Sequence, residues 1–157
     1  MSVIAIRAIR PDDKARIVRA FQGLDRRSVY LRFFSYKKEL SEEELRGVSE
    51  CDGVREVVLV ATVGSGDQEI IVGVSGYLCT GVGAEIAFTV AEDFQGRGIA
   101  TRLLRQLAEI ARDRGILQLE ADALTENTPI LNVLRHSGLR MRASQGAGIV
   151  HATIFPA

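Results

Sequence analysis

The pattern of apolar and polar positions changes past the middle of the chain, from strand-like runs to a helical repeat. Between Ile99 and Ala111, apolar residues return every three or four positions, and charged residues occupy the opposite face. This spacing is typical of an amphipathic helix. Gly115 follows the last apolar position and is expected to end the helix, because glycine readily adopts the positive φ found there. The sequence therefore predicts a helix over residues 99–111.

Three apolar runs precede this helix and predict strands. They cover Glu56–Val63, Glu69–Cys79 and Ala84–Val90, and glycine-rich turns separate them at residues 64–67 and 81–83. Short turns of this kind join strands that run in opposite directions. The three runs therefore predict an antiparallel meander.

Shorter signals predict the remaining elements. These are a strand at Val3–Ile6, a helix opened by Pro11-Asp12-Asp13, a helical segment around Ser28–Phe34, a short helix begun by the capping pattern Ser41–Glu44, a strand at Leu117–Ala121, a helix capped by Thr128 before Pro129 and ended by Gly138, and one or two closing strands within Leu139–Met141 and Ile149–Phe155. A helix joins the strands at 84–90 and 117–121, so these two are expected to be parallel in a right-handed crossover. The fold class that results is α+β, a mixed sheet with helices on both faces.

Composition narrows the class of protein. The chain has 157 residues with 20 basic and 20 acidic side chains, so its formal net charge is zero. No overall field favours nucleic acid, a membrane or a polyanion as partner. Without repeats or a linker-like segment, we expect one domain over residues 1–157. Cys51 and Cys79 lack metal or redox spacing, and no signal peptide is evident, so the sequence favours a cytoplasmic protein with reduced thiols.

The most informative segment is the turn Gln95-Gly96-Arg97-Gly98-Ile99-Ala100, which joins the strand at Ala84–Val90 to the long helix. A helix N-terminus offers backbone N–H groups that lack helical partners, together with the positive end of the helix dipole. Glycine lets the main chain approach a ligand without a Cβ in between. A diphosphate group suits such a turn.

Spacing alone leaves more than one interpretation of this turn. It could be a tight helix entry that binds no ligand. It could belong to a dinucleotide-binding unit, since the acidic residues Glu120 and Asp122 follow about 20 positions later. Against this, residues 91–95 separate the turn from its strand, and Thr101 stands where a third glycine is expected. A P-loop is excluded because no Gly-Lys-Ser/Thr follows.

A family resemblance gives the third interpretation. The motif Gln95-x-x-Gly98-x-Ala100 after a strand resembles the Q/R-x-x-G-x-G/A motif of the GNAT superfamily of N-acetyltransferases, and the order of elements is similar along nearly the whole chain. The resemblance is greatest to the acetyltransferase domain of bacterial Pat-type protein-lysine acetyltransferases. It is carried by the segments Ile6–Asp13, Ser28–Ser35, Ala84–Val90 and Glu126–Leu131. The resemblance implies a GNAT-like fold whose sheet is mostly antiparallel with one parallel pair. Pat-type enzymes usually carry an extra regulatory or ligase-like domain, which is not expected within residues 1–157.

The resemblance also implies acetyl-CoA as co-substrate. It places main-chain contacts to this cofactor at Phe88, Thr89 and Val90. It places pyrophosphate contacts at Gln95, Gly96, Arg97, Gly98, Ile99, Ala100 and Thr101. Asn127 stands where the family often binds the cofactor, although an asparagine there is equally well a turn or cap residue. No metal is expected, because His136 and His151 have no ligand partners at helical or strand spacing.

Glu85 is the candidate general base. Strand alternation places it on one face with two small neighbours, Ala87 and Thr89, which leave room for a substrate. From spacing alone it could be an ordinary solvent-facing glutamate, but Pat-type enzymes have a glutamate acting as base at the matching place. Asp52 or Glu120 could play the part instead, directly or through a water.

Other candidate residues are less informative. Many GNAT enzymes protonate the leaving thiolate with a tyrosine seven residues after the asparagine, but this chain has Leu134 there, so no general acid is assigned. Tyr30, Phe34 and Tyr77 could line an acceptor site, although aromatic residues so spaced favour core packing. Cys79 has no neighbour that would activate its thiol.

The function expected is N-acetyl transfer from acetyl-CoA to an amine, either a protein lysine or a small molecule, by direct attack. The alternative is a catalytically silent GNAT-like module that senses CoA or binds a protein partner. Acceptor specificity is expected in the segments Ser28–Glu50 and Ser144–Ile149. The identity of the acceptor and the oligomeric state stay open, although dimers are common among proteins of this kind.

Overall fold

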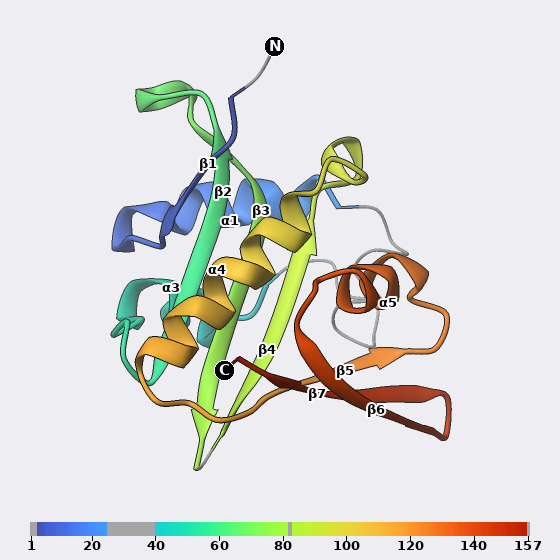
Figure 1. Ribbon diagram of the computed structural model, residues 1–157. Coiled ribbons are helices and arrows are strands. Elements are labelled where there is room, and N and C mark those ends of the chain that lie inside the picture. Colours follow the sequence, from blue (N-terminus) through green and yellow to red (C-terminus); the bar gives the residue numbers. More distant parts are fainter. Residues whose placement is uncertain (1–2, 25–39, 82, 157) are drawn as a thin grey trace.

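One seven-stranded sheet forms the centre of the molecule (Figure 1). The computed structural model describes residues 3–24, 40–81 and 83–156. The strand order is β1-β2-β3-β4-β5-β7-β6, and every described neighbour pair is antiparallel except β4–β5, which is parallel. The strands are β1 (Ala5–Ala8), β2 (Glu56–Val63), β3 (Ile70–Thr80), β4 (Gly83–Val90), β5 (Leu119–Leu124), β6 (Arg140–Gly146) and β7 (Ile149–Phe155).

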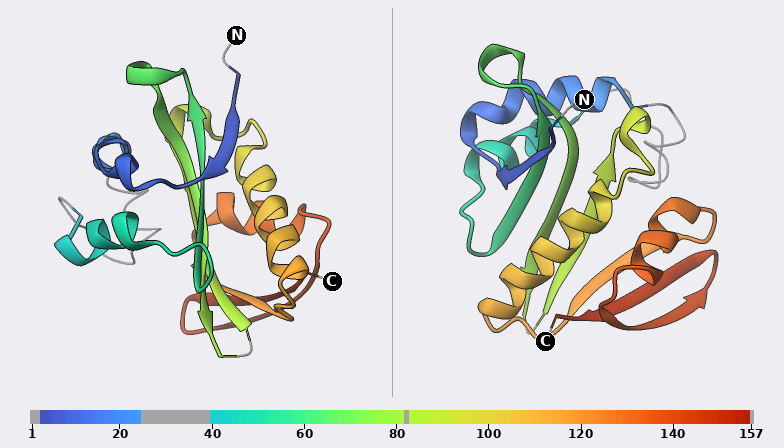
Figure 2. Two further views of the ribbon diagram at one scale, coloured as in Figure 1. Left: turned by 90° about the vertical axis from the view of Figure 1, so that its left-hand side faces the viewer. Right: turned by 45° about the horizontal axis from the view of Figure 1, so that its top comes forward.

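Helices cover both faces of this sheet, as Figure 2 shows in its left-hand view. The described α-helices are α1 (Lys14–Gln22) and α3 (Glu42–Glu50) on one face, and α4 (Ile99–Asp113) and α5 (Thr128–Arg135) on the other. Short 3-10 turns lie at Pro11–Asp13, Gly66–Gln68 and Glu92–Phe94. The α+β fold class, the antiparallel meander and the parallel β4–β5 pair are confirmed.

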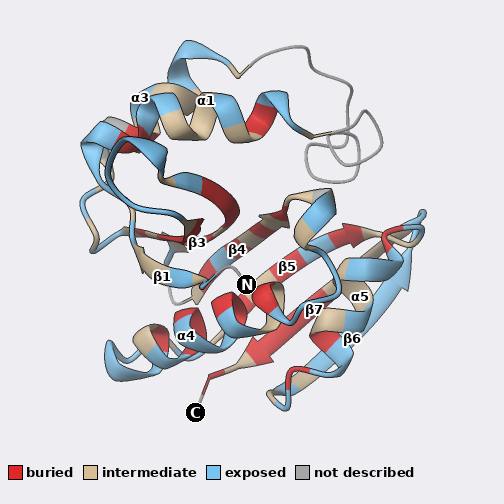
Figure 3. Cartoon of the chain, turned by 90° about the horizontal axis from the view of Figure 1, so that it is seen from above, coloured by how far each residue is buried: buried red, intermediate tan, exposed pale blue. Residues whose placement is uncertain are grey.

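The hydrophobic core lies between α4 and the strands β2, β3 and β4, where Figure 3 shows the buried face of the helix. Leu103, Leu104 and Leu107 are completely buried there. The helix approaches the sheet closely at Gly73, where a Cβ would lie 3.2 Å from the Leu103 side chain. This packing holds the N-terminus of α4 in a fixed place at the end of β4.

Local sequence signals explain where the shorter helices begin. Ser41 and Glu44 form the predicted capping box: the Glu44 N–H donates to Ser41 Oγ at 3.1 Å, and the Ser41 N–H donates to Glu44 Oε1 at 2.8 Å. The cap of α5 is Asn127 rather than the predicted Thr128, because Asn127 Oδ1 accepts the Ile130 N–H at 3.3 Å. Thr128 is instead the first residue of that helix.

Three predicted strands are displaced along the chain. The first is observed at Ala5–Ala8 rather than Val3–Ile6, because pairing with β2, and not the apolar run alone, sets its bounds. β5 lies two to three residues later than predicted. β6 extends to Gly146 and β7 begins at Ile149, so within the Ser144–Ile149 segment only Ala147 and Gly148, both at positive φ, form the hairpin turn. The helical segment expected at Ser28–Phe34 lies outside the described residues.

No described helix is long and apolar enough to cross a membrane.

Candidate active site

The parallel strands β4 and β5 part almost as soon as they meet, which Figure 1 shows plainly. Their ladder contains two residue pairs in the described chain, Ala84 with Leu119 and Glu85 with Glu120. After Glu85, β4 continues along β3 while β5 turns away to pair with β7. The result is an edge of β4 that has strand partners on one side only.

Alternation along β4 decides which main-chain groups face this edge. The Ala84 N–H donates to Gln118 O at 3.0 Å, toward β5. Residues an even number of positions further on, including Phe88 and Val90, therefore direct their N–H and C=O toward the same side. Thr89 directs its main chain toward β3. The main-chain groups of Phe88 and Val90 thus face the open edge and those of Thr89 do not. The cofactor contacts expected at these three residues stay predictions.

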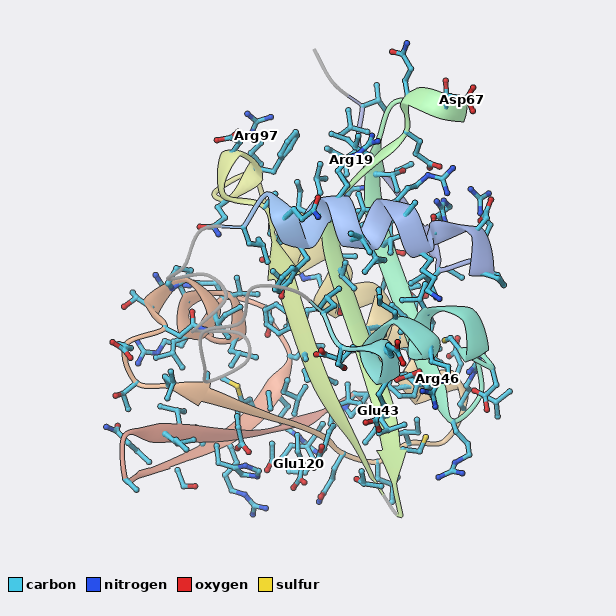
Figure 4. All side chains as sticks on the ribbon, turned by 180° about the vertical axis from the view of Figure 1, so that it is seen from behind. Arg19, Glu43, Arg46, Asp67, Arg97 and Glu120 are labelled. Atoms are coloured by element: carbon cyan, nitrogen blue, oxygen red, sulfur yellow. The ribbon has the colours of Figure 1, made fainter. Side chains whose placement is uncertain are left out.

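The turn after β4 is tied back to the strand by its first motif residue. Gln95 Nε2 donates to the Val90 carbonyl at 3.1 Å. Gly96 and Gly98 both have positive φ, 78° and 79°, which explains why glycine stands at these two positions. Arg97 points outward at the top of the molecule in Figure 4, and its guanidinium lies 4.9 Å from the Phe94 ring centre.

The N-terminus of α4 opens at this turn with unused hydrogen-bond donors. The first helical bond described for α4 runs from the Arg102 N–H to the Gly98 carbonyl, at 3.0 Å. The N–H groups of Ile99, Ala100 and Thr101 therefore have no acceptor within the helix. Gly98 is the cap residue and supplies no side-chain acceptor for them. These amides have the geometry of an anion site, strengthened by the helix dipole.

Two observations are compatible with the diphosphate predicted at this turn. A Cβ built on Gly96 or Gly98 would meet no atom within 4 Å, so space beside the main chain is open. The acidic groups described near this turn lie before it, at Asp93, and none follows in the first turn of the helix. An anion at the α4 N-terminus thus meets donors on the main chain rather than opposing carboxylates.

A hollow of about 220 Å³ lies where β4 and β5 part. Its described lining residues are Glu85, Ile86, Ala87, Phe88, Glu120, Ala121, Asp122, Ala123, Asn127, Ile130 and His151. Asn127 is buried here, and its oxygen accepts the Ile130 N–H that caps α5, while its amide N–H groups donate no hydrogen bond among those described. The cap role of Asn127 is therefore observed, while its cofactor contact stays a prediction.

Glu85 lies where this hollow adjoins a second one. The second hollow, of about 520 Å³, is on the α1 and α3 side of the sheet, and Ala87 and Thr89 line it together with Glu85. The Glu85 side chain is exposed, while Ile86 and Phe88 beside it are buried against the core. The predicted alternation is thus confirmed, and the small neighbours leave open space next to the carboxylate.

The alternative base Asp52 is already engaged with its own loop. Asp52 Oδ1 accepts the backbone N–H groups of Val54, Arg55 and Glu56 at 2.8, 2.9 and 3.2 Å. These bonds, the one from Val54 above all, hold the pKa of Asp52 below its usual value. A carboxylate so stabilised in its ionised form is a weak base, which leaves Glu85 and Glu120 as the candidates.

The expectation that both histidines are isolated is wrong for His151. Its Nδ1 lies 2.5 Å from Asp122 Oδ1, and its Nε2 lies 3.5 Å from Glu120 Oε1. The hydrogen bond with Asp122, helped by Glu120, raises the pKa of His151. The pairing of β5 with β7 creates this cluster, and spacing along the chain carries no signal of it. His136 bonds only to the Asn132 carbonyl among its described contacts, at 2.8 Å.

The remaining candidate side chains lie in the core or outside the residues that the structure describes. Tyr77 is buried in the main core cluster, which agrees with core packing, and it also lines the larger hollow, so both expectations for it stay open. Leu134 is buried in the same cluster and has no hydroxyl. Tyr30 and Phe34 lie outside the described residues. In the described part of the chain, no group of three or more His, Cys, Asp and Glu side chains is arranged to hold a metal ion.

The comparisons with known proteins agree with this geometry. The model of the acetyltransferase (GNAT) domain family matches residues 4–140. An acetyltransferase of Pseudomonas aeruginosa is 30% identical over 118 residues, which are 74% of this chain and 63% of that protein. The chain thus spans less than two thirds of the length of that relative.

Two solved structures extend the comparison to the whole fold. The GNAT domain of S. lividans PAT superposes with a TM-score of 0.86 at 29% identity, over 98% of this chain and 94% of that one. The structure of yncA from Salmonella typhimurium, solved with its cofactor acetyl-CoA, superposes with a TM-score of 0.73 at 16% identity, over 96% and 91% of the two chains. The second likeness is one of fold alone.

Three findings lead to one conclusion. β4 and β5 part after two residue pairs, no side chain caps the α4 N-terminus after the Gln95–Ala100 turn, and the family model covers residues 4–140. The chain belongs to the GNAT family of acetyltransferases, and its domain is similar to that of Pat.

Proposed function

We propose that this protein transfers an acetyl group from acetyl-CoA to an amine, with Glu85 as general base. The observation that carries the proposal is the position of Glu85 at the last paired residue of the β4–β5 ladder, where the two hollows adjoin. One hollow continues along the open edge of β4 and the other opens on the opposite side of Glu85. A donor and an acceptor can therefore approach the same carboxylate from two directions.

The residues present fit acetyl-CoA. The amides of Ile99, Ala100 and Thr101 would hold the pyrophosphate, and the open edge at Phe88 and Val90 would pair with the pantetheine arm. A main-chain N–H on that edge would also polarise the thioester oxygen. When bound, acetyl-CoA would supply the acetyl group as its thioester, and the protein would supply orientation.

Direct transfer requires a neutral amine, whereas an alkylamine is protonated at neutral pH, with a pKa near 10 for lysine. In the proposed reaction Glu85 takes the proton of the amine as the new C–N bond forms. The C–S bond breaks, and the thiol leaves with a proton from solvent, because buried Leu134 offers no acid. A general base in such a position contributes roughly 10²–10⁴-fold to the rate.

The test is the Glu85→Gln variant, assayed by thiol release with acetyl-CoA and a panel of amines that includes lysine peptides. We expect kcat to fall about 100-fold or more at pH 7. The loss should shrink as pH rises, because more of the amine is then neutral without a base. CoA affinity should not change, since the diphosphate contacts lie elsewhere.

Glu109→Gln is the matched control, because Glu109 is an exposed glutamate on α4, away from both hollows. It should leave kcat within about twofold of the wild type. An unchanged pH–rate profile in Glu85→Gln would exclude Glu85 as the base. Binding of CoA without thiol release from any acceptor would instead favour the catalytically silent module.

A further inference from the structure

The face of the sheet that bears Glu85 continues across β5 and β7 as a row of ionisable side chains. The register pairs Glu85 with Glu120 and Asp122 with His151. Residues paired across neighbouring strands share a face of the sheet. The contacts of His151, 2.5 Å to Asp122 and 3.5 Å to Glu120, then join these groups into one line that runs from Glu85 to Asp122.

The carboxylates in this row repel one another unless a positive charge lies nearby. Glu85 and Glu120 are paired on adjacent strands, so two negatively charged side chains stand next to each other on this face. None of the described residues that line the two hollows is a lysine or arginine. Within that described lining, His151 is the one side chain that can carry a positive charge.

We propose that His151, held in place by Asp122, is a positioning residue that offsets the charge of Glu120 beside Glu85, the proposed base. The proposal rests on the proposed function, in which Glu85 must be ionised to accept the proton of the amine. An imidazolium beside Glu120 offsets the negative charge that Glu120 directs at Glu85. His151 acts through its neighbours and needs no contact with substrate.

The tie to Asp122 supports this role, because it favours the charged form of His151 and so raises its pKa. Below that pKa the row holds three carboxylates and one imidazolium. Above it, the imidazole is neutral and no longer opposes the charge of Glu120. The influence of His151 on Glu85 therefore acts on the acid side of the pH range and fades on the alkaline side.

Other charged groups surround the row. Glu56 of β2 lies on the same face as Glu85, and burial above all raises its pKa. Glu44 of α3 lines the larger hollow. Arg142 of β6 is on the face of His151, but its guanidinium lies over an aromatic ring, 5.8 Å from the ring centre. Glu44 already accepts the Ser41 N–H in the cap of α3, so Glu56 is the acidic neighbour that adds to the charge His151 offsets.

The first test measures the coupling directly and needs no activity. The chain has two histidines, so NMR titration of the imidazole protons resolves both, and the His136→Gln variant assigns them. We expect His151 to titrate at lower pH in Glu85→Gln than in the wild type, because a carboxylate that favours the imidazolium has been removed. Glu120→Gln should lower it further, and Glu109→Gln should leave it unchanged.

The second test is the pH profile of kcat/KM for His151→Gln. Without the imidazolium the charge of Glu120 beside Glu85 is unopposed, so we expect the acidic limb of the profile to lie at higher pH than in the wild type. We expect kcat/KM to be about twofold lower near pH 5 and unchanged above pH 9. His136→Gln, which removes the other histidine, should follow the wild-type profile.

The outcomes separate this inference from the proposed function. Identical His151 titration in Glu85→Gln and the wild type would overturn the inference, whatever the activity. A His151→Gln profile lowered equally at every pH would also overturn it, since a structural role predicts that result. If the wild type acetylates no amine, the proposed function fails, and the NMR titration still decides whether His151 and Glu85 are coupled. The coupling should also weaken in 1 M salt, because these side chains are partly exposed.

Discussion

Asp13 is the one charged side chain among the fully buried residues described, and its partners explain how the fold tolerates it. Arg7 of β1 binds both of its oxygens at 2.8 Å, Arg16 of α1 binds one at 3.0 Å, and the Arg10 N–H donates to it at 2.7 Å. Glu69 joins the same arginines from the start of β3. The cluster fixes α1 and the first strand to the sheet.

Replacement of Asp13 by Asn should therefore destabilise the protein. The arginine would keep its charge in a partly buried place without its main partner, at a cost of roughly 3 kcal/mol in the free energy of unfolding. Asp12→Asn is the matched control, because Asp12 is 66% exposed and its ion pairs should contribute less than about 1 kcal/mol. Urea unfolding of both variants gives the comparison, and equal losses would contradict the role assigned to Asp13.

The same ion pair has a defined pH dependence. The hydrogen bonds from Arg7 lower the pKa of Asp13 from 3.8 to about 2 in the folded chain. The stability that Asp13 contributes is thus complete above the unfolded pKa and is lost as pH falls toward 2. Between pH 4 and pH 2, the wild type should lose more stability than Asp13→Asn in the same urea experiment.

These residues also show where sequence reasoning stops at this scale. The sequence places Asp13 at a helix start, where its carboxylate does accept a backbone N–H, but its pairing with Arg7 depends on how β1 is packed. Likewise Glu85 could be assigned from strand alternation and a family resemblance, whereas the link between His151 and Asp122 requires the register of β5 and β7. Contacts between strands that are far apart along the chain produce no periodic pattern in the sequence.

At the scale of elements, one face of α4 is buried on the sheet, and its N-terminus carries the amides to which we assign CoA binding. Its apolar stripe was predictable because it repeats with the helical period, and that stripe is buried on the sheet. Its unused amides were predictable from the position of two glycines in a strand–helix turn. The bounds of β1, β5 and β6 were not, since pairing with a neighbour decides where a short strand begins and ends.

Gly98 and Gly115 allow the binding role of α4 to be tested apart from its stability. They lie at the two ends of the helix, both have positive φ (79° and 76°), and a Cβ on either would meet no atom within 4 Å. Gly98→Ala and Gly115→Ala should each cost about 1 kcal/mol of stability from backbone strain.

Only Gly98→Ala should weaken CoA binding, by roughly tenfold, because its Cβ would enter the space where the pyrophosphate would lie. Isothermal titration calorimetry with CoA measures the affinity of both variants. If the two variants bind CoA equally well, the diphosphate does not lie against this turn.

At the scale of the whole molecule, the sheet is divided into a part under α4 and a part that carries β5, β7 and β6. The two parts meet at a ladder of two residue pairs. The order of elements along the chain was enough to predict the parallel pair, because a helix connects the two strands. How short their contact is, and therefore where the gap lies, could be seen only in three dimensions.

A ligand that contacts both parts should stabilise the molecule as a unit. At about 100 times its Kd, CoA would add about 2.7 kcal/mol to the free energy of unfolding. For a domain of this size, that raises Tm by about 5–10 °C. Differential scanning calorimetry with CoA measures the shift, and pantetheine, which lacks the diphosphate, should give a smaller one. Equal shifts would mean that the α4 amides take no part in binding.

The one-sided edge of β4 has a consequence for how such a protein tolerates change. Its polar groups belong to the peptide backbone, so exchanging Phe88 or Val90 for another large apolar residue would alter packing beneath α4 and leave every donor and acceptor of the edge in place. Only proline would delete an N–H there. The proposed recognition of a cofactor through the backbone would thus survive most single substitutions, and the residues around Glu85 would be free to differ with the acceptor while the opening between the strands persists.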